Sequence, residues 1–147
     1  MLVREVMSSN PVTILPTDNL KTAIERMGKL YRRLPVVDEN GRLVGIITDR
    51  DLRLAVHSPY ILRERWQDEQ LLTNTLVDNC MTPAPAYIGP DEHVQQAIQL
   101  ILKGRFSGLP VVDEDKKVIG VITVTDLLRA FDMFLTRLSA HEEELEQ

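Results

Sequence analysis

Two kinds of hydrophobic pattern alternate along the chain. Apolar residues that recur every three or four positions indicate amphipathic helices, and short continuous apolar runs bounded by turn-forming residues indicate buried strands. In the first half these patterns predict helices over 2–7, 17–30 and 48–56, and strands over 12–15, 34–37 and 43–47. Thr17 is the predicted N-cap of the second helix. The last two strands flank Asp38-Glu39-Asn40-Gly41, whose Asn-Gly pair favours a hairpin turn. The predicted order is a lead-in helix, then strand, helix, strand, strand and helix.

The second half of the chain repeats the first. Met7 aligns with Met81 and Pro11 with Pro85, and both halves contain Leu-Pro-Val-Val-Asp-Glu followed by Gly-x-x-Thr-x-x-Asp-Leu. In the second copy, strands are predicted at 86–88, 109–112 and 118–122, and helices at 91–103 and from Thr123 onward. Its turn, 113–117, lacks the glycine and is expected to be looser.

Two copies are too few for a solenoid. We therefore expect an α/β (α+β) fold in which repeat 1 (1–56) and repeat 2 (76–131) pack about a pseudo-twofold axis. A connector at 57–75 separates the repeats. Residues 132–147 are expected to form a C-terminal helix extension, whose apolar stripe could pack on a second subunit, followed by an acidic tail at 141–147 that frays.

The composition excludes several classes of function. No apolar run approaches the roughly 18 residues of a membrane helix, and a net charge of -5 disfavours nucleic-acid binding. One cysteine, Cys80, leaves no pair for an internal disulfide and fits a reducing cytoplasm; we expect Cys80, Met7 and Met81 in the core. The three histidines lack metal-ligand spacing, and no catalytic motif is present. We expect a cytoplasmic protein that is not an enzyme, with no metal, membrane or nucleic-acid partner.

The repeated Thr-x-x-Asp carries the candidate chemistry. Thr48 and Thr123 stand where a helix N-cap belongs, and Asp51 and Asp126 follow at the third helical position, as in a capping box. Amide donors and a hydroxyl at a helix start can hold a phosphate, and a carboxylate can accept hydrogen bonds from a diol such as ribose. The alternative is that these residues only cap their helices, which is common at helix starts.

The doubled pattern resembles a tandem of CBS domains, or Bateman module, and more narrowly the small CBS-pair proteins of acetoin utilisation. The resemblance implies β-α-β-β-α units, homodimers of such pairs, and adenosine-containing ligands bound in clefts between the two repeats. AMP, ADP or ATP would be the ligand, with S-adenosylmethionine a further possibility and no obligatory cofactor. We therefore expect a regulatory module that signals to an unknown regulated protein by a conformational change.

The resemblance also assigns residues. It implies that Thr48 and Thr123 contact phosphate, that Asp51 and Asp126 contact ribose, and that Arg33 meets phosphate in the first site only, since Ser107-Gly108 replaces Arg32-Arg33 in the second copy. The backbone near each first strand would read adenine. These last residues are Thr13, Ile14, Tyr87 and Ile88. A ligand-free dimerisation or scaffold module is the alternative function.

Overall fold

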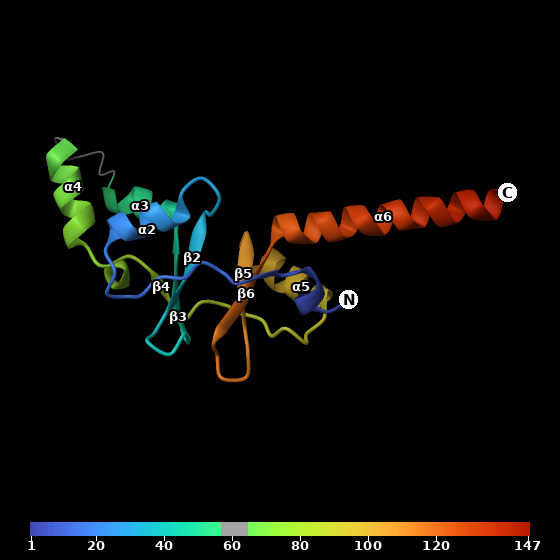
Figure 1. The fold of residues 1–147 in the computed structure, drawn as a ribbon, viewed down its shortest axis with the longest axis horizontal. Helices are drawn as coiled ribbons and strands as arrows, with labels where there is room; N and C mark the ends of the chain where they lie inside the picture. The colour runs from blue at the N-terminus through green and yellow to red at the C-terminus, as the bar shows by residue number, and fades with distance from the viewer. Residues whose placement is uncertain (57–64) are drawn as a thin grey trace. The chain divides into compact units, whose positions relative to one another are not determined.

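The computed structural model describes residues 1–56 and 65–147 (Figure 1). The first part of the predicted connector, 57–64, lies outside the described residues. The described remainder of the connector is mostly helical, as α4 (Arg65–Asn74). The chain divides into two compact units.

The first of these units comprises Pro11–Pro85 and Glu114–Val118. It contains α2 (Leu20–Met27), β2 (Arg33–Val37), β3 (Leu43–Thr48), α3 (Asp49–Val56), α4, a 3₁₀ turn η1 (Val77–Asn79) and β4 (Thr82–Pro83). Its sheet has the order β2-β3-β4 with antiparallel neighbours. We call it the repeat-1 unit.

The other unit comprises Met1–Asn10, Ala86–Asp113 and Ile119–Gln147. It contains α1 (Val3–Val6), β1 (Ser8–Ser9), α5 (Val94–Gly104), β5 (Gly108–Val112), β6 (Val118–Thr123) and α6 (Val124–Glu146). Its sheet has the order β1-β6-β5, also antiparallel where β1 meets β6. We call it the repeat-2 unit.

The two repeats exchange their first residues. Strand β1 lies among the first residues of repeat 1, directly after α1, but pairs with β6 of repeat 2, with Ser8 opposite Val121. Strand β4, at the start of repeat 2, pairs with β3 of repeat 1, with Thr82 opposite Ile46. Each compact unit is therefore one repeat completed by the lead-in of the other, an arrangement that the sequence repeat does not reveal.

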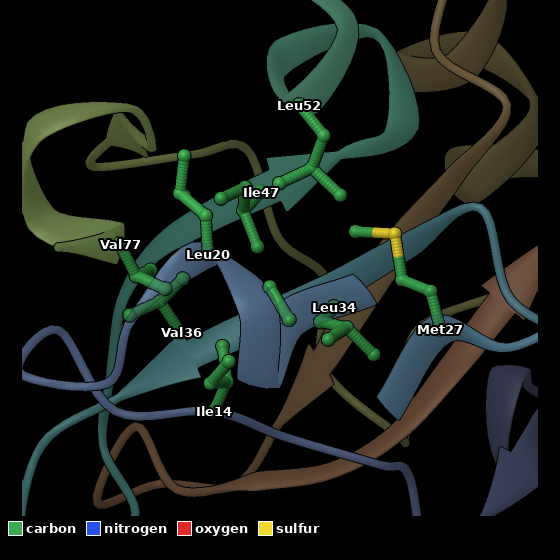
Figure 2. Packing of buried hydrophobic residues seen from close by; sticks show 9 residues of the cluster. Ile14, Leu20, Met27, Leu34, Val36, Ile47, Leu52 and Val77 are labelled. Atoms are coloured by element: carbon green, nitrogen blue, oxygen red, sulfur yellow. The ribbon is translucent and has the colours of Figure 1, made fainter. Parts of the chain in front are cut away.

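Each unit has its own apolar core. In the repeat-1 unit, the helices and strands close over a cluster that includes Val77 from the exchanged segment (Figure 2). In the repeat-2 unit, Val3 from the exchanged segment is fully buried in the equivalent cluster. The buried residues of the first cluster are Ile14, Leu20, Ala23, Met27, Leu34, Val36, Ile47, Leu52 and Val77; those of the second are Val3, Ile88, Ala97, Ile101, Leu109, Val111 and Ile122.

The glycine of each repeated motif lies under a methionine of the exchanged segment. A Cβ at Gly45 would lie 2.5 Å from the sulfur of Met81, and a Cβ at Gly120 would lie 2.7 Å from the sulfur of Met7. The same Cβ positions would lie 3.1 Å from the Thr82 carbonyl oxygen and 2.9 Å from the Ser8 carbonyl oxygen. Because backbone cannot move aside as a methionine side chain can, these contacts favour glycine in the motif. Both methionines pack against the core clusters, as expected, and so does the half-buried Cys80.

Several predicted boundaries differ from the structure. The strands predicted at 12–15 and 86–88 shrink to single parallel bridges, Ile14 with Val36 and Ile88 with Val111. Helix α2 is capped by Asn19, whose side chain accepts a hydrogen bond from the Thr22 amide at 2.9 Å, so the predicted cap at Thr17 is wrong. Helix α6 continues through the acidic residues to Glu146, where fraying was expected.

The turn of repeat 2, which was expected to be loose, is held by hydrogen bonds. Lys116 adopts a positive φ of 62° in place of a glycine. The Leu43 amide donates to the Lys116 carbonyl at 2.9 Å, and the Val118 amide donates to the Gly41 carbonyl at 3.0 Å. These bonds hold the tip 114–118 against the repeat-1 hairpin.

Candidate functional site

The first candidate site forms where β3 runs directly into α3. The Thr48 amide donates to Asp51 Oδ2 at 2.9 Å, and the Asp51 amide donates to Thr48 Oγ1 at 3.2 Å. This is the predicted capping box, with both side chains half-buried. The bonds fix the Thr48 hydroxyl and the Asp51 carboxylate at the helix start, where partial positive charge favours an anion.

Arg33 lies on the neighbouring strand, directly opposite Thr48 in the β2–β3 register. Burial lowers the pKa of the Arg33 guanidinium, and the Asp49 carboxylate partly offsets that effect. Within 1–56 and 65–147, no carboxylate lies at ion-pair distance from Arg33. The structure thus brings together three of the predicted residues, Arg33, Thr48 and Asp51. A half-buried cation beside a helix start is well suited to bind a phosphate.

The second candidate site repeats this geometry at the start of α6. The Thr123 amide donates to Asp126 Oδ2 at 2.9 Å, and the Asp126 amide donates to Thr123 Oγ1 at 3.1 Å. The hydroxyl of Ser8, on the exchanged strand β1, lies 3.5 Å from Asp126 Oδ1. Ser8 was not among the predicted site residues. The repeat alignment places Ser8 opposite Thr82, another hydroxyl, but only the exchanged pairing shows that Ser8 accompanies Asp126.

Gly108 occupies the position of Arg33 in the second site. A Cβ at Gly108 would lie 2.9 Å from the Ile122 carbonyl oxygen and 3.2 Å from the Thr123 Cα. Backbone cannot yield as a flexible side chain can, so no larger residue fits there without moving β6. The second site therefore lacks the arginine for a steric reason, in keeping with the expected difference between the two sites.

The residues expected to read adenine divide into two kinds. Ile14 and Ile88 are buried, and the amide and carbonyl of each bond to the adjacent strand: Ile14 to Pro35 and Val37, and Ile88 to Pro110 and Val112. Their backbone groups are thus already engaged. The Thr13 carbonyl accepts a hydrogen bond from Arg26 at 2.8 Å, and Tyr87 is 45% exposed. A contact of these four residues with a ligand stays a prediction.

Cys80 is close enough to the first site for the charge of Asp51 to affect its thiol. Burial raises the pKa of the Cys80 thiol, and the negative charge of Asp51 raises it further. A raised pKa keeps the thiol protonated at neutral pH, which favours the expected structural role over a reactive one.

The family model of the CBS domain matches residues 3–58 and again 77–132. The chain is a tandem CBS-domain protein. The matched ranges lie close to the predicted repeats, 1–56 and 76–131.

Relatives of this tandem CBS-domain protein include both stand-alone pairs and larger enzymes. A CBS domain-containing protein of Dictyostelium discoideum is 37% identical over 129 residues, which cover 87% of this chain and 89% of that protein. The inosine-5′-monophosphate dehydrogenase of Aquifex aeolicus is 35% identical over 126 residues, which cover 84% of this chain but only 23% of the enzyme. The similarity to the enzyme is therefore confined to a part of it.

Solved structures with the same fold include complexes with adenosine compounds. CBSX2 in complex with AMP has a TM-score of 0.77 and 28% identity, covering 90% of this chain and 97% of that one. The CBS pair of protein MJ0100, in complex with 5′-methylthioadenosine and S-adenosyl-L-methionine, has a TM-score of 0.72 and 30% identity, covering 90% and 96%. AcuB of Vibrio cholerae, named for acetoin utilisation, has a TM-score of 0.74 and 26% identity, covering 97% and 96%. The predicted family and fold are thus confirmed.

Within 1–56 and 65–147, no helix is long and apolar enough to cross a bilayer.

Proposed function

We propose that this CBS pair is a regulatory module that binds an adenosine-containing ligand of the AMP, ADP or ATP class at its two Thr-Asp helix starts. The observation that carries the proposal is the repeated geometry of Thr48 with Asp51 and Thr123 with Asp126. The AMP complex of CBSX2 and the complexes of MJ0100 support it by similarity. S-adenosylmethionine belongs among the candidates because an MJ0100 structure contains it.

The roles of the residues follow from their chemistry. Each threonine hydroxyl can still donate to a phosphate while its oxygen accepts from the aspartate amide. Each aspartate uses Oδ2 on a threonine amide, so Oδ1 can accept from ribose. In the second site, Asp126 Oδ1 also accepts from the Ser8 hydroxyl at 3.5 Å and would share its remaining lone pair with the ribose. Arg33 adds a cation to the first site that Gly108 cannot supply in the second. We infer that a ligand with more phosphates prefers the first site.

Signalling would require two conformations with different ligand affinity, since a ligand shifts an equilibrium only through that difference. The regulated protein is unknown, and the placement of the two helix starts relative to each other stays a prediction. We propose no catalytic role for this module.

The test is a thermal-shift and calorimetric titration of the purified chain with AMP, ADP, ATP and S-adenosylmethionine. Ligand at one hundred times its Kd should stabilise the fold by about 2.7 kcal/mol. Asp51→Ala should weaken binding by roughly 1.5–3 kcal/mol, the size of a hydrogen bond to a charged group. Asn19→Ala is the matched control, because it removes the cap of α2 and should lower stability without changing affinity.

The scaffold alternative makes a different prediction for the same variants. If Asp51 only caps α3, Asp51→Ala lowers the unfolding free energy equally with and without nucleotide. If none of the four adenosine compounds moves the melting temperature at millimolar concentration, the ligand proposal fails. Homodimerisation, which the resemblance implies, is measured separately by sedimentation.

A further inference from the structure

Helix α6 carries an apolar stripe that no described residue covers. The helix contacts α1 and α5 near its beginning, and every residue from Phe131 to Gln147 is exposed. Figure 1 shows the later turns of α6 extending away from the remainder of the repeat-2 unit. The stripe consists of Leu128, Phe131, Phe134, Leu135, Leu138 and Leu145, with exposed fractions from 43% at Leu135 to 75% at Leu145.

A groove borders this stripe where α6 passes α1. It has a volume of about 430 Å³ and is lined by Val6 of α1 and by Met133 and Phe134 of α6. Two arginines of α6, Arg129 and Arg137, also line it. Phe134 belongs to both the stripe and the groove, so the two surfaces are continuous.

The charges along α6 are arranged unevenly. Within 1–56 and 65–147, neither Arg129 nor Arg137 lies at ion-pair distance from a carboxylate. The two carboxylates of the groove are held by backbone amides: Glu5 accepts from Leu2, and Asp126 accepts from Thr123. Four glutamates crowd the last turns of α6, around the exposed Leu145. The basic middle of the helix therefore complements its acidic end.

The acidic end of α6 cannot reach the groove of its own chain. Leu145 is 11 residues beyond Phe134 on one continuous helix, which places it about 16 Å further along the axis at 1.5 Å per residue. A second copy of the chain can present the same acidic end from the opposite direction. This self-complementarity is what a twofold, isologous contact requires, since each copy supplies both halves of the interaction.

We propose that α6 pairs in antiparallel orientation with α6 of a second copy, so that the acidic end of each helix lies beside Arg137 and the groove of the other. Arg137 and Glu144 are seven residues apart, and so share one flank of the stripe. In an antiparallel pair the like flanks of the two helices face each other. Arg137 of each copy therefore meets Glu144 of the other, and Leu145 packs against Phe134.

A parallel pair would differ in a way that can be measured. Parallel pairing sets opposite flanks together and brings Arg137 beside Glu142 of the second copy, five residues further on. It also places both acidic ends side by side, with eight glutamates in close range. The identity of the glutamate that compensates Arg137 thus reports the orientation.

The proposal does not rest on ligand binding, and its test uses the full chain. Sedimentation velocity over a concentration series should show a dimer for the wild-type protein. Arg137→Glu should raise the dimer dissociation constant on the order of tenfold, because two exposed ion pairs are lost and replaced by repulsion. Adding Glu144→Arg to that variant should restore the dimer, whereas adding Glu142→Arg should not. Lys103→Glu, an equal change of charge on α5, is the control and should leave the dimer intact.

Three results would overturn the proposal. They are a wild-type chain that stays monomeric at about 100 µM, a dimer indifferent to Arg137→Glu, and rescue by Glu142→Arg rather than by Glu144→Arg. Because Asp126 of the second candidate site also lines the groove, the AMP-induced thermal shift is compared in an Asp126→Ala background, where adding Arg137→Glu should leave the shift unchanged. A loss of dimer with an intact shift, or the reverse, then separates this proposal from the ligand proposal.

Discussion

Replacing Val3 by alanine tests the exchange of lead-in segments between the repeats. Val3 is fully buried among residues of repeat 2, although it belongs to the first residues of repeat 1. Its amide also donates to the Glu92 carbonyl at 2.9 Å, so the backbone stays anchored when the side chain is shortened. The substitution therefore removes packing and leaves the hydrogen bond in place.

The magnitude follows from the atoms that are removed. Val3→Ala deletes the equivalent of two methylene groups, each worth about 0.8 kcal/mol on burial. The cavity that remains adds to the loss. We expect the free energy of unfolding to fall by about 1.5–3 kcal/mol, as measured by urea denaturation with an unchanged slope.

Hydrogen exchange locates the effect within the fold. Because local openings follow the stability of the segment involved, Val3→Ala should speed amide exchange in β5 and β6 more than in β2 and β3. Val77→Ala is the matched control, since Val77 is equally buried in the core of the repeat-1 unit. It should have the opposite pattern. Faster exchange in β2 and β3 on Val3→Ala, or the same pattern for both variants, would refute the exchanged packing.

Three further predictions concern Gly120, the cap of α2 and the Cys80 thiol. Gly120→Ala should destabilise the fold by about 1–3 kcal/mol in thermal or urea unfolding. The new Cβ would lie 2.9 Å from the Ser8 carbonyl oxygen, which cannot rotate away, so unchanged stability would contradict the packing. Asn19→Ala should lower the free energy of unfolding by about 1 kcal/mol through the loss of a cap, whereas Thr17→Ala should change it by less than about 0.5 kcal/mol. The reverse order would show that Thr17, as predicted from the sequence, caps α2. The Cys80 thiol, whose pKa is raised by burial, should react with a disulfide reagent more slowly in the folded than in the urea-unfolded chain. The thiol of the unfolded chain has the lower pKa and therefore ionises at lower pH than the folded one. The contribution of Cys80 to the free energy of unfolding should fall as pH rises above about 8.5, and a Cys80→Ser chain should lack that part of the pH dependence.

Local patterns account for the elements that the sequence predicted well. The apolar runs at 34–37 and 43–47 and the turn between them become β2 and β3 with their hairpin. Thr48 and Thr123 make the predicted capping boxes, because hydroxyl, amide and carboxylate lie within three residues of one another. Interactions of this range are encoded by the segment itself.

The predictions were wrong mainly where the secondary structure depends on pairing with a segment that is distant in the sequence. Ile14 lies in a predicted strand between Pro11 and Pro16, and prolines donate no amide hydrogen to a sheet. Only a single bridge with Val36 forms there. The fraying expected at 141–147 followed from the acidic composition, yet α6 is helical to Glu146. The exchanged strands are beyond local reasoning altogether, since Ser8 and Ser9 could pair with either repeat.

The repeated motif joins packing and site chemistry in one segment. Gly45 packs against Met81 because the exchanged strand β4 pairs with β3 at that point. Three residues later, Thr48 caps the helix that contains Asp51. The residues needed to fold the unit are therefore the residues proposed to bind the ligand. A loss of stability in an Asp51 variant consequently says nothing about ligand binding by itself. Only the difference between its unfolding free energies with and without nucleotide isolates the contact with ribose, which is why the Asn19 control belongs in the same titration.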